Sequence, residues 1–284
     1  MIYFCADDYG MSKESNTRIE NCIINGALNK ISVLPNGKIE ETDKLLSNKN
    51  IYPSLHINLI EGAPLSACSD VSLLVNEEGN FKYSFIGLLL LSLSFKRKEM
   101  EEQIYKEIRK QIEFWKTKTV SNESVFIDSH QHTHMIPLVF KALMRVIKDE
   151  NINIEYLRIP SEPLSPYILT PSLYFSYTPQ GIIKQWLLKF LAFVNRKEIK
   201  KSRLHSAFFM GVMFSGKMDE RKIKKVLPRY IKLAEKKQKD IELGFHPGYF
   251  EKGEAPLSEI RDDFKKFYFS PWRKIEYNTL LNIK

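Results

Sequence analysis

The segment 125–137, VFIDSHQHTHMIP, places three of the chain's six histidines within five positions. These are His130, His132 and His134, and Asp128 precedes the first of them by two positions. Imidazole nitrogens and carboxylate oxygens bind divalent metal ions and also transfer protons near neutral pH. If the backbone is extended here, all four side chains lie on one side, because alternate residues of a strand share a face. We therefore expect metal or acid–base chemistry at this segment.

Residues of the same kinds follow other predicted strands. Asp7 and Asp8 come after an apolar run at the start of the chain, His56 and Asn58 alternate with apolar residues in LHINLIEG, and His246 precedes the Pro-Gly pair of GFHPG. Adjacent aspartates can also belong to a turn or a helix cap, and a lone strand histidine is often a hydrogen-bonded core residue. The coincidence of several such residues at strand ends favours a site over these separate explanations.

Short apolar runs alternate with longer amphipathic stretches along the chain. Predicted strands are Ile2–Cys5, Ile31–Leu34, Ser54–Leu59, Val125–Asp128, Ile154–Ile159, Ala207–Phe214 and Ile241–His246, and predicted helices are Lys13–Asn29, Lys98–Thr117, Pro137–Asp149 and Asp219–Lys237. This alternation is typical of an α/β fold with a parallel sheet, open or closed into a barrel, whose sites gather at the carboxyl ends of the strands. We therefore expect the polar residues after the strands to meet.

Carboxylates and imidazoles that converge at such an edge could bind a divalent metal and carry out acid–base catalysis beside it. Hydrolysis of an amide or ester needs these groups: one to take a proton from water and one to protonate the leaving group. Two alternatives stay open, a metal-dependent phosphoesterase and a non-catalytic sugar-binding protein. The first would be expected to carry further aspartates and asparagines for a second metal.

Composition narrows the setting of the protein. The chain of 284 residues has a formal net charge of +9, but its lysines are interleaved with acidic residues and with apolar residues at helical spacing. We therefore expect solvated helix faces and no nucleic-acid binding. Cys5, Cys22 and Cys68 form no CxxC pair, and the first residues carry two aspartates before any long apolar run. These features predict a cytoplasmic protein without disulfides, signal peptide or membrane anchor.

Five motifs together resemble the YdjC-like carbohydrate deacetylases, which include chitooligosaccharide deacetylases and hopanoid-biosynthesis-associated relatives. The motifs are ADDYGMS, LHINLIEGAPL, DSHQHTHMIP, RIPSE and GFHPGY, and they extend from about Phe4 to about Tyr249. Tyr9 stands where phenylalanine is common in the family. The resemblance implies a single-domain, distorted TIM-like (β/α) barrel over residues 1–284, with insertions near 81–97 and 172–205. It also implies removal of N-acetyl groups from amino sugars with one divalent metal.

The resemblance assigns roles by position in each motif. Asp8, His56 and His130 match the metal ligands, Asp7 resembles the general base, and His246 resembles the imidazole that acts as general acid.

Four more residues are implied as neighbours of this centre. Asn58, His132 and His134 are substrate-facing or support the ligands, and Arg158 orients Asp7 or binds substrate. Two nitrogens and one carboxylate suit zinc, and with water in the remaining positions they also suit magnesium, manganese or cobalt.

Two apolar stretches, 85–95 and 181–203, are unusual for the family. The first is too short to span a bilayer and is expected to form core or a lid. The second combines apolar residues with seven lysines and arginines, and so predicts a helix that packs on the barrel, forms a homodimer interface, or lies on an anionic membrane surface. In the last case we expect a lipid-linked glycan substrate and a peripheral position at the inner face of the membrane, with Trp186, Phe190 and Leu191 exposed.

Overall fold

A parallel sheet forms the centre of the protein. The computed structural model describes residues 1–39, 43–119, 124–214, 216–257 and 262–283. The strands are β1 (Ile2–Tyr9), β2 (Lys30–Val33), β3 (Tyr52–Ile57), β4 (Val125–Ser129), β5 (Ile154–Leu157), β6 (Phe208–Met210) and β7 (Ile241–Phe245). They pair in the order β5-β4-β3-β2-β1-β7-β6, with every pair parallel. Each strand matches a predicted one, so the α/β prediction is confirmed.

The sheet curls into a half-barrel. Its two edge strands, β5 and β6, approach each other, since the backbone N–H of Leu157 donates to the carbonyl of His205 just before β6 at 3.0 Å. The predicted strand 207–214 is shorter in the structure. The backbone leaves the sheet at Gly211, and the N–H groups of Val212 and Met213 donate to the carboxylate of Glu162 instead of to a neighbouring strand.

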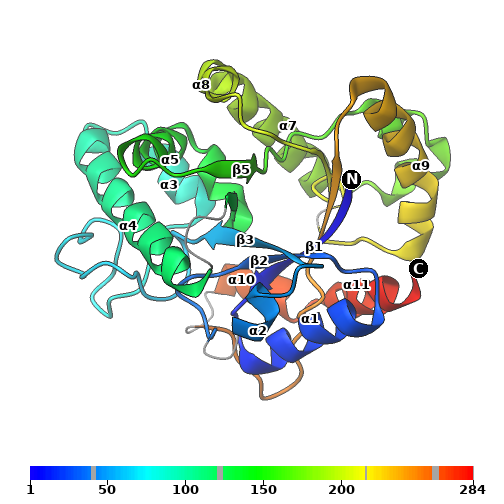
Figure 1. Ribbon diagram of the computed structural model, residues 1–284, viewed down its shortest axis with the longest axis horizontal. Helices are drawn as coiled ribbons and strands as arrows, with labels where there is room; N and C mark the ends of the chain where they lie inside the picture. Colours follow the sequence, from blue (N-terminus) through cyan, green and yellow to red (C-terminus); the bar gives the residue numbers. More distant parts are fainter. Residues whose placement is uncertain (40–42, 120–123, 215, 258–261, 284) are drawn as a thin grey trace.

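Helices follow most strands and cover the sheet (Figure 1). The helices are α1 (Lys13–Asn25), α2 (Asp43–Leu46), α3 (Phe85–Leu91), α4 (Arg97–Lys118), α5 (Pro137–Asp149), α6 (Ser165–Ile168), α7 (Pro179–Val194), α8 (Arg196–Ser202), α9 (Glu220–Lys237), α10 (Asp262–Tyr268) and α11 (Pro271–Asn282), with 3-10 segments η1 (His130–Met135) and η2 (Pro171–Ser176). Helix α1 begins where the Ser12 hydroxyl accepts from Ser15 N at 3.1 Å, and α9 where Asp219 accepts from Lys222 N at 2.8 Å.

The row of histidines is not extended, and this part of the sequence interpretation is wrong. Strand β4 ends at Ser129, and the chain turns through η1 with Gln131 and His132 in the left-handed region, at φ 51° and 62°. Because of this turn His130, His132 and His134 point in different directions instead of sharing a face. The alternation argument fails here because the strand stops one residue before the first histidine.

The two apolar stretches form helices at the surface. Helix α7 buries Leu188 and Leu191 in an apolar cluster with Met135, Phe209 and Val212. Leu191 is therefore not exposed, in contrast to the expectation for a membrane-binding face, because it lies one turn from Leu188 on the inner side of the helix. Trp186 and Phe190 are exposed, as is Ile86 of α3. Within the described ranges, no helix has the length and apolar character required to span a bilayer.

Candidate active site

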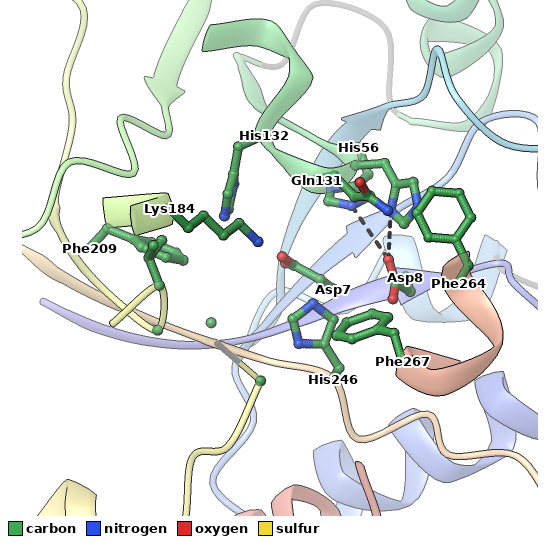
Figure 2. Close-up of a pocket in the computed structure, with 15 residues that line it drawn as sticks. Asp7, Asp8, His56, Gln131, His132, Lys184, Phe209, His246, Phe264 and Phe267 are labelled. Carbon is green, nitrogen blue, oxygen red and sulfur yellow. Dashed lines mark ion pairs between the residues drawn. The ribbon is translucent and has the colours of Figure 1, made fainter. Parts of the chain in front are cut away.

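Two adjacent carboxylates of β1 enter the same pocket, which a regular strand does not permit because neighbouring side chains point to opposite faces. The pairing of β1 with β2 shifts register between Ala6 and Tyr9, and Asp8 has a φ of 69°. This bulge directs both Asp7 and Asp8 into a pocket of about 210 Å³ (Figure 2). A strained backbone at this position is typical of a functional site.

Asp8, His56 and His130 come together at the ends of β1, β3 and β4. Each offers one ligand atom, and these atoms lie within 4.8 Å of one another. Asp8 Oδ1 is 2.9 Å from His130 Nδ1 and 3.7 Å from His56 Nε2, the two contacts drawn as dashed lines in Figure 2. All three side chains are buried. Their convergence from positions 8, 56 and 130 is the geometry that a cation site requires.

The outer nitrogen of each histidine is held by a carboxylate. His56 Nδ1 lies 2.6 Å from Asp128 Oδ1, and His130 Nε2 lies 2.7 Å from Glu61 Oε2. These contacts aim the remaining nitrogen of each ring at Asp8, as carboxylates do for metal-binding histidines. Asp8 Oδ1 is buried and, despite its closeness to His130, has no hydrogen bond of acceptable geometry among the described residues. The donor set therefore fits one divalent cation.

The buried carboxylates around His130 favour positive charge on its imidazole. Burial alone would lower the pKa of His130, but the negative charges of Asp8 and Glu61 outweigh it and raise that pKa to about 10. Without a cation this imidazole therefore holds a proton at neutral pH. A metal that binds must displace this proton, so that its affinity should weaken as the pH falls.

Asp7 is paired with a buried arginine. Arg158 donates from Nη1 to Asp7 Oδ2 and from Nη2 to Asp7 Oδ1, both at 2.8 Å. Burial would raise the pKa of Asp7, but the charge of Arg158 outweighs it and holds that pKa below its usual value. Arg158 is itself fixed by Glu242, at 2.6 Å, and by Asp128, at 3.1 Å. It orients Asp7 and is not among the side chains that line the pocket.

His246 lines the same pocket as Asp7 and Asp8. Its ring packs edge-on against Phe267, with centroids 5.0 Å apart, and its Nδ1 lies 3.8 Å from Glu276 Oε2. Burial lowers the pKa of His246 to about 4, so the imidazole is neutral in the resting site. Nearby, Arg273 Nη2 donates to Asp8 Oδ2 at 2.6 Å. Each of the two pocket carboxylates thus has its own arginine.

The other predicted residues have different surroundings. His132 lines the pocket and packs edge-on against Phe209, with centroids 5.6 Å apart. His134 lies behind the pocket, where its Nε2–H donates to the carbonyl of Arg158 at 2.7 Å and its Nδ1 accepts from the Ser129 hydroxyl. Asn58 accepts from the backbone N–H of Glu61 at 3.1 Å and so holds the turn that carries this carboxylate.

Several residues of the site were not predicted from the sequence. Glu61 stands in the motif LHINLIEG, and Lys184 is one of the basic residues of 181–203, but neither was assigned to the pocket. Arg273 reaches Asp8 across 265 positions without any motif of its own. Tyr268, whose hydroxyl donates to Glu61, is equally remote. The positions of Lys184, Tyr268 and Arg273 follow only from the packing of α7, α10 and α11 around the sheet.

Comparison with known proteins places these features in context. The family described as YdjC-like protein matches residues 1–283. A carbohydrate deacetylase of Thermoanaerobacter pseudethanolicus is 30% identical over 193 residues, which are 66% of this chain and 73% of that protein. One from Danio rerio is 29% identical over 160 residues, 55% of this chain and 49% of that protein, so that the match spans about half of the fish relative. A crystal structure of a proposed cellobiose-phosphate cleavage protein from Enterococcus faecalis V583 shares the fold, with a TM-score of 0.64, 16% identity, and coverage of 99% of this chain and 90% of that one.

Proposed function

This chain belongs to the YdjC-like protein family, and we propose that it is a metal-dependent hydrolase that removes N-acetyl groups from an amino sugar and releases acetate. The observation that carries the proposal is the convergence of Asp8, His56 and His130 beside an ion-paired Asp7 and a neutral His246. The carbohydrate deacetylases among its relatives support the same reaction. Residues 1–284 would act as one domain.

Asp8, His56 and His130 would hold one divalent cation, through a carboxylate oxygen and two imidazole nitrogens. When bound, the cation would polarise the amide carbonyl and make an attacking water more acidic. Zinc suits this donor set, and magnesium, manganese or cobalt would suit it with added water.

Asp7 takes the proton of the water that attacks the amide carbon, and Arg158 holds its carboxylate in position and ionised. The C–N bond breaks as a proton reaches the amine, and His246 delivers this proton. Because burial lowers the pKa of His246 to about 4, its ring is neutral at rest, so the proton that Asp7 takes from the water must pass to His246 before it reaches the amine. His132 faces the substrate, while Asn58 and His134 support the site from behind.

The setting of the reaction belongs to the same proposal. The chain acts in the cytoplasm, and the exposed apolar residues of 181–203, among them Trp186 and Phe190, would contact either the inner face of the membrane or a second copy of the chain. The basic residues around them would favour anionic lipid. A lipid-linked amino sugar is the substrate that a membrane contact would serve.

A panel of N-acetylated amino sugars, free and lipid-linked, tests the proposal when incubated with the purified protein and added metals. We expect acetate and a free amine in equal amounts from at least one sugar, and no acetate with Asp8→Ala. Release of phosphate from phosphorylated sugars without any acetate would overturn the proposal and favour a phosphoesterase.

A further inference from the structure

Lys184 is a cation of the pocket that the proposed reaction does not use. It projects from α7 into the space between His132 and Asp7 (Figure 2) and lines the same pocket as the proposed metal ligands. Burial lowers the pKa of Lys184 in spite of the nearby carboxylates. Among the residues that the structure describes, its ammonium group has no ion pair or hydrogen bond.

The two pocket carboxylates do not need this charge. Asp7 is held by two hydrogen bonds from Arg158, and Asp8 is held by Arg273 at 2.6 Å. A divalent cation at Asp8 would add further positive charge beside Lys184. An ammonium group that is partly withdrawn from water and has no partner is costly unless an anion arrives with the ligand.

An apolar groove adjoins the pocket at this residue. It has a volume of about 310 Å³, and its walls are mainly Phe85 and Ile86 of α3 and Ile183, Leu187 and Leu188 of α7. Lys184 and Gln131 line both the groove and the catalytic pocket, so the two spaces adjoin at these residues. Along this path lie first the three proposed metal ligands, then the ammonium group of Lys184, and then the apolar groove.

In a 2-acetamido sugar the anomeric carbon is bonded to the carbon that carries the acetamido group. An anion on the anomeric oxygen therefore lies beside the reacting amide, and whatever is bonded to that anion lies one step further away. The substrate thus carries the amide, the anion and the group bonded to that anion in this order. The protein offers the proposed metal ligands, Lys184 and the groove in the same order.

We propose that the substrate is an amino sugar joined through an anomeric phosphate to a hydrocarbon chain, with Lys184 binding the phosphate and the α3–α7 groove holding the first part of the chain. This inference rests on the proposed deacetylation and specifies its substrate class. A charge-assisted hydrogen bond to phosphate should raise kcat/KM about 10- to 100-fold. Each methylene buried in the groove should add about fourfold.

Four probes separate the two contributions: N-acetylglucosamine, its 1-phosphate, its neutral decyl glycoside, and the decyl ester of the 1-phosphate. Acetate release gives kcat/KM for each probe with the wild-type chain and its variants. We expect Lys184→Met to remove the preference for phosphate and Ile183→Asp to remove the preference for the decyl chain. Lys232→Met on α9 and Ile24→Asp on α1, which replace exposed residues far from the pocket, are the matched controls and should keep both preferences.

Equal kcat/KM for the neutral and phosphorylated sugars would overturn the phosphate assignment, and so would a Lys184→Met variant that loses activity on both equally. A preference for the 1-phosphate without any gain from the decyl chain would overturn the groove and indicate a free sugar phosphate.

Calorimetric binding of decyl phosphate to the full chain provides a readout without turnover. We expect Lys184→Met to weaken it about 10- to 100-fold relative to Lys232→Met. If neither these probes nor the wider panel of amino sugars releases acetate, the proposed function fails, while this binding comparison still tests Lys184. Unchanged binding would refute its role in either case.

Discussion

The two neighbouring aspartates should respond to the same substitution in different ways. Asp8 Oδ1 faces two imidazoles and accepts no hydrogen bond among the described residues. Both oxygens of Asp7, in contrast, accept hydrogen bonds from Arg158. We therefore expect Asp8→Asn to lose the metal, and Asp7→Asn to retain one equivalent at saturating metal. An amide cannot take a proton from water, so Asp7→Asn should lower kcat about 10²- to 10⁴-fold with little change in KM.

The structure also sets the cost of Asp7→Asn in stability. The amide oxygen can accept one of the two Arg158 hydrogen bonds, and the amide nitrogen cannot accept the other. Arg158 keeps Glu242 at 2.6 Å and Asp128 at 3.1 Å, so its charge stays paired. The loss should therefore resemble one charge-assisted hydrogen bond, about 1.5–3 kcal/mol of unfolding free energy.

Three measurements separate these effects. Metal content after dialysis, kcat from acetate release at saturating metal, and urea unfolding at pH 7 should be compared for wild type, Asp7→Asn and Asp8→Asn. Activity in Asp7→Asn within tenfold of wild type would refute the role of Asp7 as base. Loss of metal from Asp7→Asn, with a normal content in Asp8→Asn, would show that the two roles are exchanged.

Three further substitutions test the surroundings of the site. His246→Ala should lower turnover about 10²- to 10⁴-fold and recover partly on acetamides with less basic leaving amines; an equal loss on good and poor leaving groups would show that His246 only positions substrate. Glu61→Gln should lower the pKa of His130 from about 10. Because a metal binds only after that proton leaves, the metal affinity of this variant should change less steeply with pH than that of wild type. Calorimetric titrations that give the same slope of metal affinity against pH for both proteins would contradict this. For His134 burial lowers the pKa to about 4, so the folded chain binds its proton less readily than the unfolded chain and stability falls as the pH drops from about 6.5 to 4. His134→Gln keeps a donor to the Arg158 carbonyl, and its unfolding free energy should decrease by about 2–3 kcal/mol less than that of wild type between pH 7 and pH 4.5. Urea unfolding at the two pH values measures this difference, and an equal decrease in both proteins would show that His134 is not its source.

The frame of the fold could be predicted because its signals are local. Apolar runs such as residues 125–127 are recognised from neighbouring residues alone, and the seven strands overlap the runs that predict them. Parallel strands then bring their carboxyl ends to one edge, which is why residues as distant as Asp8 and His130 could be expected to meet.

Backbone detail could not be predicted. The alternation rule places the three histidines of the row on one face, which is wrong because β4 ends at Ser129 and the chain then turns through the left-handed residues Gln131 and His132. The left-handed residue Asp8 within β1 is likewise not indicated by the sequence pattern. The bulge at Asp8 and the turn at His132 depend on contacts made elsewhere in the fold. No pattern within a few residues encodes them.

The positioning of helices after the sheet was also beyond the sequence. Arg273 reaches Asp8 because α11 packs near α1, and Lys184 reaches the pocket because α7 buries Leu188 and Leu191 over η1. Both depend on tertiary packing between elements that are distant in the chain. Amphipathic periodicity indicated a packed or membrane-bound helix at 181–203, but it gave no indication of which lysine faces the site.

The most direct test of the account is a metal titration of the chelator-treated protein, with acetate release from a responsive N-acetylated amino sugar measured at each addition. The cluster of Asp8, His56 and His130 predicts no acetate without metal and a linear rise that ends at one equivalent per chain. Full activity in the metal-free protein, or a rise that continues to two equivalents, would contradict a single-metal deacetylase.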